Sequence, residues 1–101
     1  MNGAVSNRIE ELRQLCQAYR VKTMYAFGSA CADNFNEASD IDLLISFDSL
    51  TIDQYTENYF ELHYRLEDLF NRLVDLLTDR SLSTPYFISE LDRTKQLIYA
   101  N

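Results

Sequence analysis

Two strand-forming segments in the first half of the chain, residues 22–27 and 40–47, constrain the fold more than any other feature. Segment 22–27 is rich in β-branched and aromatic residues and ends at Gly28, and segment 40–47 alternates acidic or polar with apolar residues over most of its length. Only about eleven residues join the two, whereas a parallel crossover needs a dozen or more and usually a helix. We therefore expect antiparallel strands, joined by a loop or short helical turn over residues 29–39.

The rest of the chain contains three helical patterns and one further apolar run. Residues 6–20 and 53–71 carry apolar side chains at three- and four-residue steps, which is typical of amphipathic helices. Residues 72–78 are mostly apolar and are predicted to form a third strand. Pro85 begins a last helix, because proline is favoured in a first helical turn. Its inner stripe is predicted to consist of Phe87, Leu91, Thr94 and Ile98. The order of elements predicts an α/β (α+β) fold, in which helices pack on a small mixed β-sheet of about three strands.

The chain, residues 1–101, is predicted to be a single domain, because only Gly3, Gly28 and Pro85 punctuate it and it has neither linker nor repeat. No apolar run is long enough to cross a membrane and the N-terminus lacks an apolar signal region, so we expect a cytoplasmic protein. Two cysteines do not make a disulfide framework, which agrees with a reducing compartment. The net charge of -7 argues against direct nucleic-acid binding through a basic surface and is compatible with a cation site.

The pair Gly28-Ser29 directly follows the first strand. Glycine lets a backbone approach a ligand closely, and the Ser29 hydroxyl with the following N–H groups suits phosphate oxygens. A Gly-Ser pair after a strand is more often an ordinary turn. By itself, this feature is therefore weak evidence for a site.

Three aspartates stand at positions that need an explanation. Asp40 and Asp42 are two residues apart at the start of a strand, so their side chains share a face, with Cα atoms roughly 6.6 Å apart. A hard divalent cation, which takes oxygen ligands, relieves the repulsion between such carboxylates. Asp75 interrupts an apolar run, and burying a carboxylate without a partner is costly. The alternative explanation for Asp40 and Asp42 is that both are solvated at the exposed start of a strand. The alternative for Asp75 is that one face of its strand is exposed to solvent.

The spacing of these features resembles that of a known family. Gly28-Ser29, ten residues, Asp40-Ile41-Asp42 and an aspartate inside a later strand resemble the polymerase-beta-like nucleotidyltransferase superfamily, and within it the minimal nucleotidyltransferase (MNT) family. Such a match arises by chance in on the order of one in a thousand chains of this size. The resemblance covers nearly the whole chain, since Leu97-Ile98-Tyr99 is similar to the end of the family's last helix. It implies the nucleotidyltransferase fold.

The resemblance also implies a role for each of these residues. Gly28 and Ser29 would hold the triphosphate of the nucleotide, and Asp40 and Asp42 would hold magnesium. Asp75 would bind the catalytic ion and help to deprotonate the acceptor hydroxyl. The expected cofactors are two Mg²⁺ ions and ATP as the nucleotide donor, because two ions can stabilise the attacking and leaving oxygens of an in-line displacement at phosphorus.

Small members of this family are often paired with a helical HEPN-type toxin, so the resemblance implies that the chain is an antitoxin. It would transfer a nucleoside monophosphate, AMP from ATP, to a hydroxyl group, expected to be that of a tyrosine in the toxin. The chain lacks the extra helical domain with which antibiotic-modifying relatives bind their acceptor. A partner protein is therefore expected to supply the acceptor.

The loop after Ser29 departs from the family's pattern. Ala30-Cys31-Ala32-Asp33 stands where the family often carries basic residues and a glycine, so this loop has no positive charge to hold phosphate. Arg80, after the third strand, is a candidate for that charge. A non-catalytic binding antitoxin, or a partner subunit with a degenerate nucleotide site, stays open as the alternative function.

The other chemistry-bearing residues are interpreted as structural. His63 is the only histidine and is expected to be packed or half-exposed rather than catalytic. Tyr55 and Tyr59 lie on the apolar stripe of a helix and are expected in the core. Tyr86 and Tyr99 are interpreted as exposed residues of the last helix that would suit a partner surface.

Overall fold

The computed structural model describes residues 3–28 and 40–101 of the chain. The elements are α1 (Gly3–Ser6), α2 (Ile9–Ala18), β1 (Val21–Phe27), β2 (Ile41–Phe47), α3 (Ile52–Phe70), β3 (Val74–Thr78), a short 3-10 helix (Asp79–Ser81), α4 (Pro85–Thr94) and β4 (Gln96–Ala100). Within the described residues the predicted order of helices and strands is observed, with two further helical turns, α1 and the 3-10 helix, and one more strand, β4. The predicted turn or loop over residues 29–39 lies outside the described residues.

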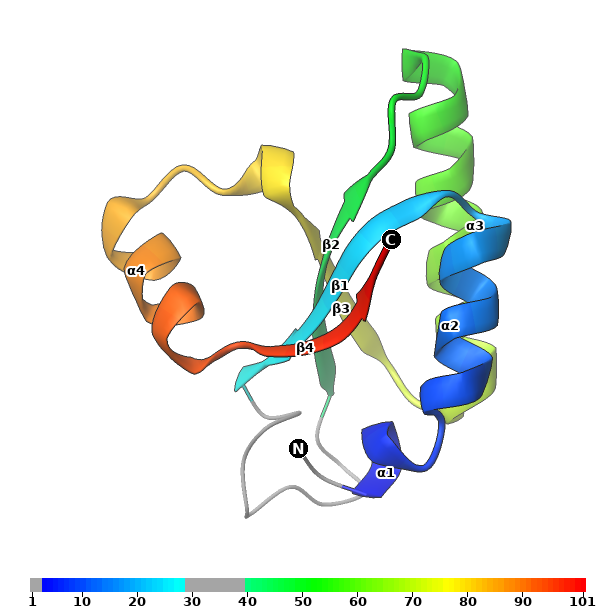
Figure 1. Cartoon of the computed structure of the whole chain (residues 1–101), viewed down its shortest axis with the longest axis horizontal. Helices are drawn as coiled ribbons and strands as arrows, with labels where there is room; N and C mark the ends of the chain where they lie inside the picture. Colours follow the sequence, from blue (N-terminus) through cyan, green and yellow to red (C-terminus); the bar gives the residue numbers. More distant parts are fainter. Residues whose placement is uncertain (1–2, 29–39) are drawn as a thin grey trace.

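The described strands form one sheet in the order β3-β2-β1-β4 (Figure 1). β1 and β2 run antiparallel, as the short connection between them predicted. β3 is parallel to β2, because the 19-residue helix α3 carries the chain back along the sheet. β4 pairs with β1 in the antiparallel sense and forms the other edge. The sheet is mixed, as expected, and β2 lies inside it.

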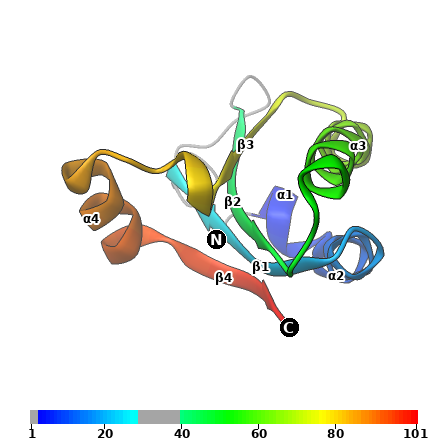
Figure 2. The same cartoon turned by 90° about the horizontal axis from the view of Figure 1, so that it is seen from above.

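The two faces of the sheet are covered differently. Helices α2 and α3 lie on one side and α4 lies on the other (Figure 2). In β2, Ile41 and Leu43 are fully buried in the core under α2 and α3, whereas Leu44 belongs to a smaller cluster with Phe27 and α4. Because side chains alternate along a strand, Asp42 extends from the same face as Leu44. We call this side, with Phe27, Asp42 and Leu44, the α4 face.

Local sequence sets both ends of α3. The Thr51 side chain accepts a hydrogen bond from the Gln54 backbone at 3.2 Å, and the Gln54 side chain accepts one from the Thr51 backbone at 3.2 Å, which makes a capping box. At the other end, Asn71 adopts a left-handed φ of 52°, which stops the helix before β3. Neither α3 nor any other helix within residues 3–28 and 40–101 has the length and apolar composition needed to cross a membrane.

The prediction that the last helix includes Ile98 is wrong. α4 ends at Thr94, and residues 96–100 form β4, which pairs with β1. Ile98 packs against the core under α2 and α3, whereas Leu91 packs on the α4 face, so the two cannot share one helical stripe. Pairing gives hydrogen-bond partners to the otherwise free edge of β1, and this outweighs the helical spacing. Leu97-Ile98-Tyr99 is therefore strand, and the sheet has four strands rather than three in the described part of the chain.

Candidate active site

Asp42 and Asp75 lie side by side at the end of the sheet where β2 and β3 begin. They are partners in the parallel pairing of the two strands, and both extend from the α4 face. Asp40 directly precedes β2 and is exposed, Asp75 is exposed as well, and Asp42 is half-buried. β3 thus has a wet face at Asp75, which is one of the two explanations that the sequence left open. The fold brings the three aspartates to one end of the sheet, although Asp75 is distant from the others in the sequence.

The carboxylates at this end of the sheet repel one another, and this repulsion shifts the pKa of Asp75. Partial burial raises the pKa of Asp75 above its ordinary value of 3.8, and the negative charges of Asp42 and Asp40 raise it further, while His63 lowers it. Neighbouring negative charges that disfavour a carboxylate favour a cation placed among them. The site therefore has the electrostatic character of a cation site.

Gly28 borders the acids on the β1 side. It follows Phe27, whose partner across the antiparallel pair is Asp42. The φ of Gly28 is 55°, in the left-handed region that favours glycine, and a Cβ on this residue would lie 2.6 Å from Asp42 Oδ2. Glycine is therefore needed both for the turn and for the close approach of the Asp42 carboxylate. Ser29, the second residue of the predicted nucleotide-binding turn, lies outside the described residues.

The donor set at this end of the sheet suits a hard divalent cation. Three carboxylates offer the oxygen ligands that Mg²⁺ prefers, and a bound cation would relieve the repulsion at Asp75. Within residues 3–28 and 40–101, no three His, Cys, Asp or Glu side chains are already arranged as a metal-binding group. The fit to such an ion therefore rests on donor chemistry and charge.

Two residues of α3 that the sequence did not assign to the site contact β3 beside Asp75. His63 Nε2 lies 2.8 Å from the Val74 carbonyl oxygen, and the Val74 N–H donates to Glu67 Oε2 at 3.0 Å. The sequence does show a histidine and a glutamate four residues apart on a helix. This spacing does not distinguish a pair that contacts a strand from a pair on a solvated helix face. His63 is partly buried, as expected, but its hydrogen bond also joins the helix to the strand.

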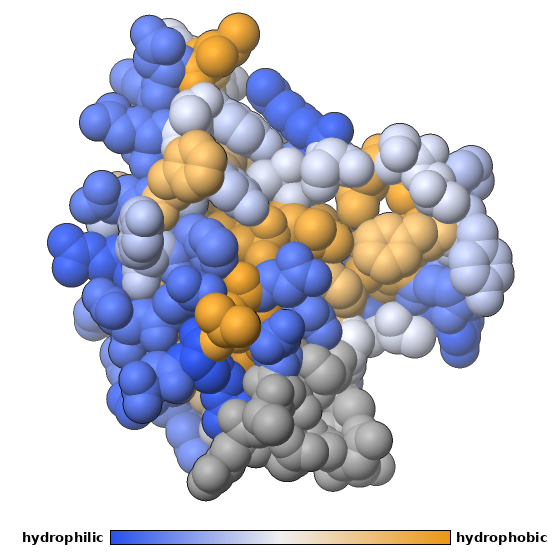
Figure 3. Space-filling model, turned by 180° about the vertical axis from the view of Figure 1, so that it is seen from behind, coloured by the Kyte–Doolittle hydropathy of each residue, from blue (hydrophilic) through white to orange (hydrophobic). Residues whose placement is uncertain are grey.

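Aromatic side chains border the acids on the α4 face. The rings of Phe27 and Phe87 meet edge to face, with centroids 6.3 Å apart. Phe87 is 39% exposed and its neighbour Tyr86 is 76% exposed, in agreement with the prediction for Tyr86, whereas Tyr99 is half-buried in β4. Seen from behind, apolar side chains gather in the middle of the molecule (Figure 3). An apolar and partly aromatic surface therefore adjoins the acidic end of the sheet.

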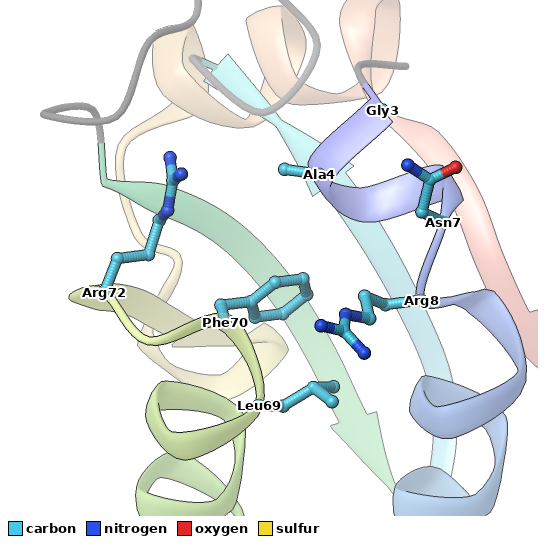
Figure 4. Close-up of a pocket in the computed structure, with 7 residues that line it drawn as sticks. All are labelled: Gly3, Ala4, Asn7, Arg8, Leu69, Phe70 and Arg72. Carbon is cyan, nitrogen blue, oxygen red and sulfur yellow. The ribbon is translucent and has the colours of Figure 1, made fainter.

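A separate cavity of about 470 Å³ lies between α1 and the end of α3 (Figure 4). Arg8 extends toward Phe70 from one side of it, and Arg72 lies on the other side. Arg8 forms an ion pair with Glu11 at 2.8 Å. Neither Gly28 nor any of the three aspartates lines this cavity, although Arg72, which does, lies at the same end of β3 as Asp75.

Arg72, rather than Arg80, lies at the acidic end of the sheet. Arg72 precedes Leu73, whose carbonyl oxygen accepts a hydrogen bond from the Ile41 N–H at 3.1 Å at the start of β2. Arg80 follows the opposite end of β3, and its guanidinium carbon lies 4.7 Å from the centre of the Tyr55 ring. Arg80 is therefore not placed beside the acids, contrary to the expectation that it supplies positive charge for phosphate.

Residues 10–101 match the family model described as "Polymerase beta, Nucleotidyltransferase". Two similar proteins come from Methanocaldococcus jannaschii. One, named "Putative protein adenylyltransferase MJ1379", is 36% identical over 81 residues, which are 80% of this chain and 78% of that protein. The other, named "Putative protein adenylyltransferase MJ0126", is 33% identical over 88 residues, which are 86% of this chain and 84% of that protein.

Solved structures share the fold. The structure of a "putative minimal nucleotidyltransferase" has a TM-score of 0.76 at 26% identity and covers 91% of this chain and 90% of its own. A toxin-antitoxin structure with AMP-PNP has a TM-score of 0.71 at 22% identity, with 92% and 73% covered. A structure of tri-AMPylated Shewanella oneidensis HEPN toxin in complex with MNT antitoxin has a TM-score of 0.65 at 20% identity, with 95% and 72% covered. These likenesses confirm the predicted nucleotidyltransferase fold.

Proposed function

This chain belongs to the polymerase beta nucleotidyltransferase family and is a nucleotidyltransferase, and from that premise we propose that it transfers AMP from ATP to a hydroxyl group of a partner protein. The observation that carries the proposal is the pairing of Asp42 with Asp75 across β2 and β3, with Gly28 against the Asp42 carboxylate. The relatives named as protein adenylyltransferases support AMP as the transferred group and a protein as the acceptor.

Asp40, Asp42 and Asp75 are the proposed ligands of two Mg²⁺ ions. When bound, such ions neutralise phosphate charge and stabilise the attacking and leaving oxygens. The chain contributes carboxylates on a rigid support: Asp42 lies in an interior strand with paired neighbours on both sides, and Asp75 is paired with it. Fixed carboxylates reduce the reorganisation that the reaction requires.

The proposed reaction is an in-line displacement at the α-phosphorus of ATP. The acceptor hydroxyl oxygen forms a bond to this phosphorus, and the bond from the phosphorus to the bridging oxygen of pyrophosphate breaks. Asp75 accepts the hydroxyl proton, and pyrophosphate leaves. Little covalent chemistry is asked of the protein, since positioning and charge neutralisation supply most of the rate enhancement.

Gly28 and Ser29 are proposed to hold the triphosphate. The absence of a side chain at Gly28 supports this role, because it lets the Asp42 carboxylate lie against the end of β1 and so brings the predicted nucleotide-binding turn next to a proposed metal ligand. Arg72 is proposed to offset phosphate charge at this end of the sheet, in place of the basic residues that the loop after Ser29 lacks.

The proposed acceptor is a tyrosine of a HEPN-type toxin, so that the chain acts as the antitoxin of a pair. Two of the similar structures support this choice: one is a toxin-antitoxin complex with AMP-PNP, and the other holds a tri-AMPylated HEPN toxin with an MNT antitoxin.

A second candidate function is neutralisation of the toxin by contact alone. It is favoured by the loop Ala30-Cys31-Ala32-Asp33, which places a negative charge where the family often has positive ones. Both functions involve the same complex, so complex formation does not distinguish them. Transfer of AMP does.

The test is mass spectrometry of the partner protein encoded beside this chain, after incubation of both with ATP and Mg²⁺. Transfer predicts one or more added AMP groups on the partner, absent with Asp40→Ala/Asp42→Ala and retained with Asp68→Ala, which removes an exposed aspartate of α3. A stable complex without any adduct from any of the four nucleotides would reject transfer and support neutralisation by contact.

A further inference from the structure

The outer edge of β3 is bound by side chains rather than by another strand in the described part of the chain. The Ile41 N–H of β2 donates to the Leu73 carbonyl at 3.1 Å. In a parallel pair, alternate residues of a strand direct their N–H and C=O groups to the same neighbour. The backbone groups of Leu73 and Asp75 therefore face β2, and those of Val74 and Leu76 face away from it.

Side chains of α3 take up these outward-facing groups. The Val74 N–H donates to Glu67 Oε2 at 3.0 Å. His63 Nε2 donates to the Val74 carbonyl at 2.8 Å, and this nitrogen must carry the proton because a carbonyl oxygen can only accept. The Tyr59 hydroxyl donates to the Leu76 carbonyl at 2.6 Å. Three outward-facing backbone groups on either side of Asp75 thus have partners on one helix.

The three side chains form a row along α3, because Tyr59, His63 and Glu67 are spaced four residues apart. We call this row the α3 ladder. His63 Nε2 also lies 3.4 Å from Glu67 Oε2, and these two side chains are only 33% and 29% exposed. Hydrogen bonds that are partly shielded from water hold their geometry better than exposed ones, so the ladder fixes β3 to the helix.

We propose that the α3 ladder positions Asp75 beside Asp42 for metal binding and transfer. The inference rests on the proposed function, in which Asp75 is a metal ligand. Its bonds engage the residue before Asp75 and the residue after it, whereas Asp42 is held by the interior strand β2. Loss of the ladder therefore lets β3 shift against β2 and separates the carboxylates. Tyr59, His63 and Glu67 are positioning residues, which do not themselves touch the substrate.

A ladder that only shields a free sheet edge from pairing with another chain would have the same contacts. The two roles differ in what happens at the site. Shielding alone predicts that variants of the ladder aggregate or lose stability but bind metal normally while folded. Positioning predicts that folded variants bind metal more weakly.

The experiment compares the chain with Glu67→Ala, Glu67→Gln and Glu61→Ala at a temperature where all are folded by circular dichroism. Glu61 is an exposed residue of the same helix and serves as the matched control. Mn²⁺ alone is titrated by calorimetry, and hydrogen exchange is measured at each amide of β2 and β3. For Glu67→Ala we expect the Mn²⁺ dissociation constant to rise about 10-fold, the lower end of the range seen when a group supporting a metal ligand is removed.

Exchange should also be faster in Glu67→Ala at Val74 and at Ile41, whose N–H donates to Leu73 across the pair of strands, with exchange at the β2 amides that face β1 unchanged. Glu67→Gln should restore both properties, because its amide oxygen still accepts from the Val74 N–H. Wild-type Mn²⁺ affinity in folded Glu67→Ala would overturn the proposal. If Glu67→Ala does not fold, Tyr59→Phe replaces it, because this change removes only the hydroxyl that donates to Leu76. We expect Tyr59→Phe to weaken Mn²⁺ binding as well. Unchanged Mn²⁺ binding in Tyr59→Phe would overturn the proposal.

Failure of the proposed function gives a different result. In that case the unaltered chain neither binds Mn²⁺ nor transfers AMP, and Asp75 has no metal to be positioned for. Amide exchange then decides whether the ladder fixes β3 against β2: faster exchange at Ile41, whose N–H donates to Leu73, supports it in Glu67→Ala, and unchanged exchange at Ile41 overturns it.

Discussion

At the residue scale, Gly28 is the position where one added methyl group has the most direct effect. In Gly28→Ala, the new Cβ would lie 2.6 Å from Asp42 Oδ2, and the residue would have to keep a left-handed φ of 55°. We expect a loss of about 1–3 kcal/mol in the free energy of unfolding, measured by urea denaturation. AMP transfer should fall as well, because the Asp42 carboxylate is displaced.

Gly3→Ala provides the matched control. Gly3 lies in α1, and its Cβ would come no closer than 3.7 Å to the Asn7 side chain. Since alanine is the better helix former, stability should be unchanged or slightly raised. A loss at Gly3 as large as that at Gly28 would show that the close approach to Asp42 is not the cause.

Replacing Asp75 by asparagine should stabilise the fold while abolishing transfer. Partial burial, then Asp42 and Asp40, raise the pKa of Asp75, so its ionised form is less stable in the folded chain than in the unfolded one. Because Asp75 is exposed and screened by solvent, we expect a gain of a few tenths to about 1 kcal/mol at pH 7 without divalent ions. Thermal unfolding and the partner-modification assay measure the two effects.

The pH dependence of this gain follows from the direction of the shift. A raised pKa means that the folded state binds the proton more tightly, so the destabilisation is complete above the folded-state pKa and disappears below the ordinary value of 3.8. The difference in stability between Asp75→Asn and the unaltered chain should therefore vanish when the pH falls below that value. A gain of equal size for Asp68→Asn, at an exposed aspartate of α3, would contradict this account.

At the scale of elements, α3 connects β2 to β3 and carries the ladder, so its start should matter for the whole sheet. Thr51→Ala removes the side-chain acceptor of the capping box. We expect a loss of about 1 kcal/mol, which in a domain of this size lowers the thermal midpoint by about 4–8 °C. Thr56→Ala, on the exposed side of the same helix, should leave the midpoint unchanged or raise it slightly.

At the scale of the whole molecule, which carries a net charge of -7, binding of a cation should raise the thermal stability of the folded chain. A cation that binds the folded chain and not the unfolded chain stabilises it, by about 2.7 kcal/mol at 100 times its dissociation constant. We expect Mg²⁺ to raise the thermal midpoint, and chelation by EDTA to reverse the rise. Asp40→Ala/Asp42→Ala should not respond in this way.

A chain with a net charge of -7 is also stabilised by screening alone. The Mg²⁺ titration is therefore run at an ionic strength held constant with NaCl. An equal rise in the unaltered chain and in Asp40→Ala/Asp42→Ala would mean that Mg²⁺ acts by screening and not at the three aspartates.

Strands and helices that depend on neighbouring residues were predictable from local sequence patterns. The short connection required β1 and β2 to be antiparallel, and the alternation in β2 placed Asp42 on the face opposite the main core. The pattern Gly28-Ser29 with Asp40-Ile41-Asp42 and Asp75 was sufficient to indicate the family, because these residues are spaced along the chain as the fold requires.

Features that depend on pairing across the sheet could not be predicted from the sequence. The helical spacing from Phe87 to Ile98 is a local signal, and it was overruled because residues 96–100 gain partners on the free edge of β1. The roles of His63 and Glu67 could not be predicted from the sequence either, because two polar residues four apart on a helix are also typical of a solvated face. Their partner is the backbone of Val74, whose position depends on the parallel pairing of β3 with β2 and not on any nearby residue in the sequence.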